Sequence, residues 1–216
     1  MVYGIKDDSV ETLLWRILQT EAIPNLHPKI CVVHVGTHDL SEMKPSKIAA
    51  GIRSVVRELQ KLMPETHFVI AGLLPRADDV MKRMIKENTP MIGKAIDPFK
   101  DMSALSWTDS RFNRRVRETN AWLARIAAVP PAPDLKRPPM SYMDCTHDFL
   151  LPGEAGADPS DIPFKLMPDM LNLSLEGHRR WRACMRDGLQ YLEETWYKKQ
   201  QKEEPLHHKK HHHGKK

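Results

Sequence analysis

The sequence lacks the features that mark secreted, metal-stapled or membrane-spanning chains. Only three cysteines occur, Cys31, Cys145 and Cys184, with no metal-type spacing, which argues against a disulfide framework or a zinc knuckle. No apolar stretch approaches the roughly 20 residues of a transmembrane helix, and no basic-then-apolar leader opens the chain. We therefore expect an intracellular protein without membrane insertion. A cytoplasmic, ciliary or mitochondrial location is equally compatible with these residues.

An excess of charge of one sign is also missing from most of the chain. Residues 198–216 hold seven lysines and two glutamates, which accounts for the whole net charge of +5. The preceding residues are neutral on balance, unlike proteins that read nucleic acid through a basic folded face. We expect residues 197–216, which are rich in lysine and histidine, to form a disordered tail that contacts an acidic surface or RNA.

What the chain does contain is enough apolar material for a core, 41% of 216 residues. Apolar runs typical of strands alternate with stripes typical of amphipathic helices. The pattern predicts extended segments at residues 2–5, 29–35, 67–73 and 140–144, and helices at 10–18, 45–62, 111–128 and 177–196. This alternation predicts parallel βαβ units with helices on both faces of one sheet.

Two stretches do not fit this rhythm and are expected to be insertions. Residues 77–109 and 129–168 are rich in proline, methionine and aspartate and are long for simple connections. We expect them to lie on the surface of a single domain that covers residues 1–196, where they would cover a cleft or meet a partner.

Polar residues follow the predicted strands, at the sheet edge where ligands of open parallel sheets bind. They are KDDS at 6–9, GTHD at 36–39 and LPR at 74–76, and DMLN at 169–172 precedes the last helix. Together they predict an acidic, histidine-bearing pocket at this rim.

Several of these phrases resemble landmarks of the SGNH (GDSL-type) hydrolases, and in particular the platelet-activating-factor acetylhydrolases. They are VGTHDL at 35–40, GLLPR at 72–76 and DMLNLSLEG at 169–177, joined by YGIKDDSVETLLWRI at 3–17. The resemblance implies a flavodoxin-like, three-layer α/β/α sandwich. It also implies a serine nucleophile, an oxyanion hole made by a glycine amide and an asparagine side chain, and an Asp-x-x-His pair that activates the serine.

The residues that the resemblance places at these positions are mostly of the wrong type. Asp7 aligns with the oxyanion glycine, His38 with the oxyanion asparagine and Asn172 with the catalytic histidine. Only Asp169, the orienting carboxylate, matches, and no Gly-Asp-Ser phrase occurs. An amide cannot act as a base, and a carboxylate at the oxyanion position repels the developing charge. We therefore expect no catalytic residues.

The resemblance also implies that the first, central strand is missing between the segments at 2–5 and 29–35. Such a gap would leave two open strand edges. Three explanations stay open: a partner chain donates the strand, the neighbouring strands close up, or the N-terminus is incomplete.

Other histidines have simple explanations. His34 in the strand-like run is expected to be a satisfied core histidine, and His178, a conceivable substitute base, to be a surface or packing residue. His147 and Asp148 form a loop pair without a partner in sequence. A zinc or manganese site at Asp7, His38 and Asp169 is a minor alternative because no pair has a diagnostic spacing. We expect no metal and no cofactor.

The sequence thus predicts an inactive SGNH-like protein that serves as a structural or interaction subunit of a larger assembly. One alternative is an active esterase whose N-terminus is incomplete. Another is an RNA-associated assembly protein that uses the tail and two arginine-rich helices, around residues 111–117 and 179–186.

Overall fold

The structure is a computed structural model, and it describes residues 4–19, 26–88, 104–130, 139–151 and 160–197. The predicted tail therefore lies almost wholly outside the described residues. So do residues 2 and 3 of the predicted first strand, while Gly4 and Ile5 are not in a strand.

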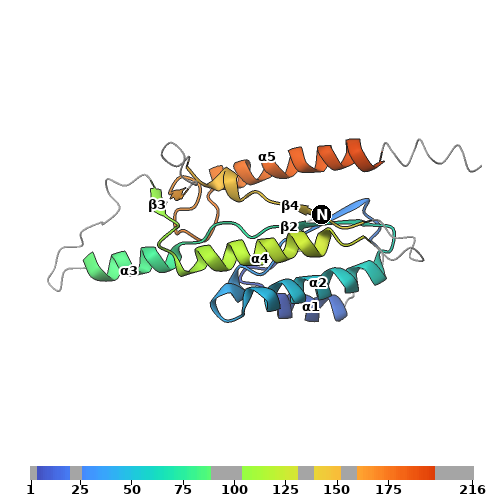
Figure 1. Ribbon diagram of the computed structural model, residues 1–216, viewed down its shortest axis with the longest axis horizontal. Coiled ribbons are helices and arrows are strands. Elements are labelled where there is room, and N and C mark those ends of the chain that lie inside the picture. Colours follow the sequence, from blue (N-terminus) through green and yellow to red (C-terminus); the bar gives the residue numbers. More distant parts are fainter. Residues whose placement is uncertain (1–3, 20–25, 89–103, 131–138, 152–159, 198–216) are drawn as a thin grey trace, which may run out of the picture.

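Three parallel strands form the centre of the fold (Figure 1). They are β1 (Ile30–Val33), β2 (His67–Ala71) and β4 (Ser141–Met143), in the order β1-β2-β4. The register pairs Val32 with Val69 and Ile70 with Tyr142. Every residue of β2 is buried, as expected for a strand covered on both faces.

Helices cover both faces of this sheet. The bounds are α1 (Val10–Leu18), α2 (Pro45–Leu62), α4 (Arg111–Ala127) and α5 (Leu175–Leu192), with a π-helical turn at Glu193–Tyr197. Helices α1, α2 and α4 lie on one side of the strands and α5 on the other (Figure 1). The predicted three-layer α/β/α sandwich is confirmed. No described helix has the length and hydropathy of a membrane span.

Local sequence signals set where the helices begin. The Ser9 side chain accepts a hydrogen bond from the backbone of Thr12, whose hydroxyl binds back to the Ser9 amide in a capping box. Pro45 occupies the first turn of α2. Ser110 and Ser174 cap α4 and α5. Helix α5 therefore begins two residues before Gly177, its predicted start.

The expectation that residues 77–109 and 129–168 are surface insertions is wrong for much of their described part. They contain regular elements: the helix α3 (Asp78–Asn88), the strand β3 (Ala104–Ser106), the 3-10 helix η2 (Thr146–Phe149) and the strand β5 (Asp161–Pro163). Strands β3 and β5 pair antiparallel in a second small sheet. Trp107 and Ile162 are fully buried. Long-range pairing between the two stretches, which no local pattern reveals, brings these side chains into the core.

The expectation of no disulfide is also wrong. Cys145 and Cys184 are bonded, with their Cα atoms 6.0 Å apart, and this links η2 to the middle of α5. The link matters because α5 is thinly packed: Gly177 is its one buried residue. The apolar side chains on its inner face, such as Trp181 and Leu189, are half-buried.

Candidate functional site

The cavity at the carboxyl end of β1 lies where the sequence predicted a pocket. Its volume is about 290 Å³. Its walls come from the N-terminal segment, the turn after β1, the end of β2 and the start of α5, and the lining residues are Gly4, Ile5, Asp7, Asp8, Leu13, residues 34–38, Leu74, Pro75, residues 171–173, His178 and Trp181. Gly36 forms the sharp turn here with φ +114°, and a Cβ at this position would press on Ile48 of α2. This explains why the VGTHDL phrase requires glycine.

Three of the four residues singled out by the sequence line this cavity: Asp7, His38 and Asn172. Asp7 has left-handed backbone, φ 63°, which aspartate tolerates better than most residues. Its Oδ1 lies 3.5 Å from Nε2 of His38, so the two form a pair. A carboxylate thus faces the cavity where a neutral donor would be needed to stabilise an oxyanion.

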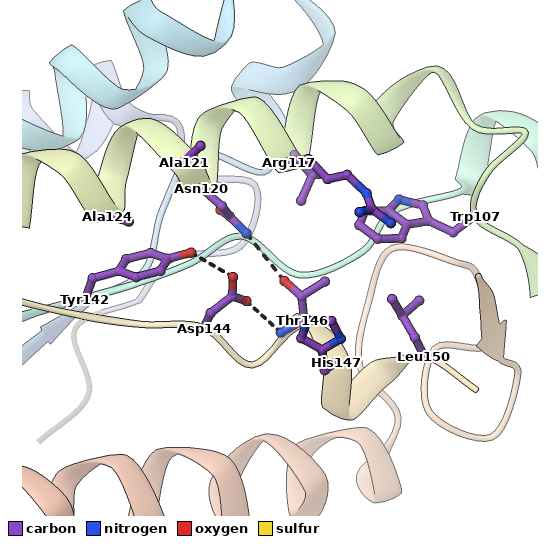
Figure 2. A pocket seen from close by; sticks show the side chains of 11 residues that line it. Trp107, Arg117, Asn120, Ala121, Ala124, Tyr142, Asp144, Thr146, His147 and Leu150 are labelled. Atoms are coloured by element: carbon purple, nitrogen blue, oxygen red, sulfur yellow. Dashed lines mark hydrogen bonds between the residues drawn. The ribbon is translucent and has the colours of Figure 1, made fainter. Parts of the chain in front are cut away.

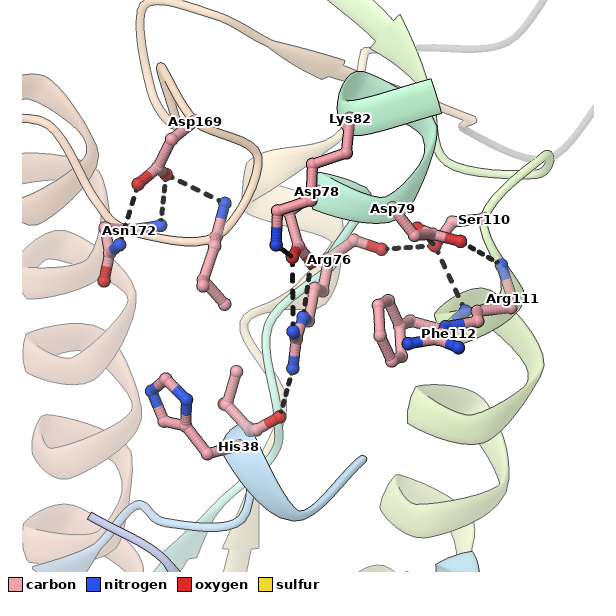
Figure 3. Close-up of polar contacts among 12 residues, drawn as sticks. His38, Arg76, Asp78, Asp79, Lys82, Ser110, Arg111, Phe112, Asp169 and Asn172 are labelled. Carbon is pink, nitrogen blue, oxygen red and sulfur yellow. Dashed lines mark hydrogen bonds and ion pairs between the residues drawn. The ribbon is translucent and has the colours of Figure 1, made fainter. Parts of the chain in front are cut away.

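Asp169 and Asn172 form a closed hydrogen-bonded turn (Figure 3). Oδ1 of Asp169 accepts from the backbone amides of Asn172 at 2.6 Å and Leu171 at 3.0 Å. Nδ2 of Asn172 donates to Oδ2 of Asp169 at 2.7 Å. Burial alone would raise the pKa of Asp169, but these hydrogen bonds lower it. Asn172 therefore donates a hydrogen bond to the carboxylate, but its side chain has no basic atom that could take up a proton.

Backbone strain accompanies this turn. Met170, between Asp169 and Leu171, has φ 58° and a completely buried side chain. A non-glycine residue in this region costs on the order of 1–3 kcal/mol. The surroundings hold it there: the Met170 carbonyl accepts from the amide of Ala77 at 3.0 Å.

Histidines line this rim, but among the described residues no hydrogen bond joins a serine, threonine or cysteine side chain to any of them. Among those described residues, no hydrogen bond or ion pair joins His38 to Asp169 or Asn172. His178 lines the cavity and is exposed. The group of three potential metal ligands found in the described part is Cys145, Asp148 and Cys184, and its two sulfurs are already bonded to each other.

A buried ionic network next to the cavity was not predicted. The guanidinium of Arg76 donates to both carboxylate oxygens of Asp78, at 2.5 and 3.3 Å, and to the carbonyl of Thr37 at 2.7 Å (Figure 3). Burial alone would raise the pKa of Asp78, but Arg76 and Lys82 lower it. Arg76 also lies 4.0 Å over the ring of Phe112. Arg76 thus holds the loop after β1 against the start of α3.

His34 differs from its prediction as a satisfied core histidine. Its Nδ1 is buried without a hydrogen-bond partner. Burial lowers its pKa, although hydrogen bonding to the backbone of Ala71 and Gly72 partly opposes this. The ring is therefore neutral at neutral pH.

Acidification should destabilise the protein through His34. Because the pKa of His34 is lower in the folded state than in the unfolded state, the unfolded chain takes up a proton at a higher pH. The contribution of neutral His34 to the free energy of unfolding is therefore fully present above about pH 6.5 and is lost as the pH falls below that value. We expect His34→Phe to flatten the fall in Tm between pH 7.5 and 5.5, whereas the exposed His147→Gln should leave it unchanged. Thermal unfolding at several pH values measures this, and an equally steep fall of Tm with pH in His34→Phe and in the unmodified protein would contradict the prediction.

A second cavity, of about 270 Å³, lies between α4 and the segment after β4 (Figure 2). Asp144 accepts from the Tyr142 hydroxyl at 2.9 Å and from the Thr146 amide at 2.8 Å. Burial and the charge of Asp144 raise the pKa of Tyr142. Trp107 and His147 also line the cavity. Its polar groups are largely paired with one another.

Part of the chain is similar in sequence to known proteins. No family model matches it. It is 32% identical over 95 residues to the platelet-activating factor acetylhydrolase IB subunit beta homolog of Drosophila melanogaster, covering 44% of this chain and 40% of that protein. It is 39% identical over 74 residues to the IB subunit alpha1 of Rattus norvegicus, covering 34% and 31%. The matches thus span less than half the length of these relatives.

Solved structures share its fold at low sequence identity. A GDSL-like lipase from Bacteroides thetaiotaomicron matches with a TM-score of 0.52 and 16% identity, over 88% of this chain and 74% of that one. A carbohydrate esterase family 3 protein from Talaromyces cellulolyticus matches with a TM-score of 0.51 and 12% identity, over 88% and 70%.

Proposed function

We propose that this chain, which has the fold of the GDSL-like hydrolases and is similar over part of its length to platelet-activating factor acetylhydrolase subunits, is a non-hydrolytic member of the SGNH/GDSL hydrolase family. In this proposal it acts as an interaction subunit of a larger protein assembly. The retained fold provides the scaffold, and the rim cavity no longer performs acyl transfer.

The observation that carries the proposal is the Asp169–Asn172 turn. In the family mechanism the residue at position 172 must accept the proton of the nucleophile. Asn172 makes the hydrogen bond to Asp169 that positions such a residue, but its amide cannot accept a proton at useful pH. This holds whatever group would serve as nucleophile.

The oxyanion positions support the same conclusion. Asp7 and His38 face the cavity as a pair. A carboxylate there disfavours the negative charge of a tetrahedral intermediate, the opposite of what catalysis requires. Losing a single group of a catalytic triad already costs several orders of magnitude in rate.

An interaction role is supported by large apolar side chains that the described part of the fold leaves exposed on α1. Trp15 and Leu18 of α1, three positions apart, are 63% and 59% exposed. If this proposal is right, the native protein should elute from a size-exclusion column together with other polypeptides, as one complex. Migration as a free monomer of about 25 kDa would contradict this role.

The non-hydrolytic proposal is tested with a fluorophosphonate probe and an acetate ester substrate. We expect no labelling and no turnover above the buffer rate. The variant Asn172→His, which restores an imidazole, should remain inactive because Asp7 still faces the cavity. An active GDSL esterase serves as the positive control. Stoichiometric labelling of one serine in the unmodified protein would contradict the proposal.

A further inference from the structure

Three potential metal ligands meet where η2 contacts the middle of α5. Cys145 directly precedes η2 and Asp148 belongs to it, and side chains three positions apart on a 3-10 turn share one side of it. Cys184 reaches the same place from α5. The two sulfurs and a carboxylate oxygen of Asp148 all lie within 4.8 Å of one another. Segments with a sequence separation of 39 residues therefore supply one compact cluster.

The Asp148 carboxylate has no partner of its own in this cluster. Within the described ranges, no hydrogen bond or ion pair engages its side-chain oxygens, although its backbone amide donates to the Cys145 carbonyl at 3.1 Å. Asp148 and Cys184 are both half-buried. A half-buried carboxylate loses part of its hydration, and a bound cation compensates for that loss. The partial exposure of these two residues also gives an ion a way in.

The spacing of the three atoms suits zinc once the S–S bond is open. Zn–S bonds of about 2.3 Å and Zn–O bonds of about 2.1 Å at tetrahedral angles place neighbouring ligand atoms about 3.6–3.8 Å apart. The carboxylate oxygen reaches this distance through a small side-chain rotation, and the sulfurs reach it by separating. Two thiolates with one carboxylate favour Zn²⁺ over Mg²⁺ and Ca²⁺, which prefer oxygen ligands alone.

We propose that the reduced protein binds one Zn²⁺ ion through Cys145, Asp148 and Cys184. A dithiol reductant breaks the S–S bond: two electrons and two protons pass to the cysteines, and the reductant itself becomes a disulfide. Zn²⁺ then displaces the two thiol protons, forms two Zn–S bonds and one Zn–O bond, and keeps a water molecule in its fourth position. The ion ties η2 to α5 in the reduced protein, as the disulfide does in the oxidised protein.

Cobalt is a suitable probe because Co²⁺ occupies tetrahedral thiolate sites and absorbs visible light, whereas Zn²⁺ does not. The full chain is reduced with a phosphine and titrated with CoCl₂ in the absence of oxygen. We expect sulfur-to-cobalt charge-transfer bands that saturate and then disappear when Zn²⁺ is added. The oxidised protein carries the same histidine-rich residues 207–213 but no thiolate pair, so it should show no such bands.

The variants separate the three ligands. Asp148→Asn keeps both cysteines and should weaken Zn²⁺ binding to the reduced protein at least tenfold, as measured by competition with a chromophoric chelator. Glu118→Gln, which removes an exposed carboxylate from α4 on the other side of the sheet (Figure 1), is the matched control and should bind normally. Cys184→Ser should weaken the bands, whereas Cys31→Ala should leave them intact. Because Asp148→Asn retains the disulfide, the Tm of its oxidised form shows whether it folds.

Zinc should also stabilise the reduced protein. At a free Zn²⁺ concentration a hundredfold above Kd, Tm should rise by about 5–10 °C, and the Tm of the oxidised protein should not change. The proposal is wrong if the reduced protein shows no charge-transfer bands, if Asp148→Asn binds Zn²⁺ as tightly as the unmodified protein, or if Zn²⁺ leaves the Tm of the reduced protein unchanged. The non-hydrolytic role is tested separately, by probe labelling and ester turnover.

Discussion

Replacing Arg76 with alanine should destabilise the protein by about 3–5 kcal/mol, because it leaves the Asp78 carboxylate buried without its main partner. The side chains of Arg76 and Asp78 are 8% and 7% exposed, so water cannot substitute for the guanidinium. The change also removes the contacts with the Thr37 carbonyl and the Phe112 ring. Chemical denaturation monitored by circular dichroism measures the effect.

The partner variants determine the origin of this loss. If the unpaired carboxylate causes it, the double variant Arg76→Met with Asp78→Ala should be clearly more stable than the sum of the two single changes predicts. Arg76→Lys keeps the charge but not the bidentate geometry, so its stability should lie between that of the unmodified protein and that of Arg76→Ala. It also provides a foldable variant if Arg76→Ala is too unstable. Strict additivity would mean that the pair contributes nothing specific.

Removing the Cys145–Cys184 disulfide should have an effect of similar size. The bond closes a loop with a sequence separation of 39 residues. By restricting the unfolded chain, a bond across a loop of this length stabilises the folded state by about 4 kcal/mol. For a chain of this size, Tm should fall by about 8–16 °C. Thermal unfolding of Cys184→Ser, and of the unmodified protein with and without dithiothreitol, measures this.

Helix α5 should respond first to the loss of this bond. Its inner face is half-buried, and the bond from Cys184 to Cys145 is its covalent tie to η2. Limited proteolysis is therefore expected to cut within α5 after reduction. Cys31→Ala, which changes the free cysteine, should leave the cleavage pattern unchanged and should lower Tm much less than loss of the disulfide. An unchanged Tm on reduction would show that packing alone holds α5.

The rim of the sheet shows how far the sequence leads to a candidate site. Strand runs followed by GTHD and LPR predicted a polar pocket beyond the carboxyl ends, because parallel strands all end at the same edge. The structure places Asp7, His38 and Asn172 there. The Arg76–Asp78 pair and the unpaired nitrogen of His34 were not predicted. Their environments depend on which layers meet.

The sequence by itself determined the fold class and most of the helices and strands, because apolar periodicity and capping residues act over a few neighbouring positions. It also determined that position 172 carries an amide instead of an imidazole, since this is a matter of chemical type. Only the tertiary structure decided that Cys145 bonds to Cys184, that Trp107 and Ile162 are buried, and that β3 pairs with β5. These features join residues tens of positions apart, and their energies depend on burial and distance, which arise only when the layers pack.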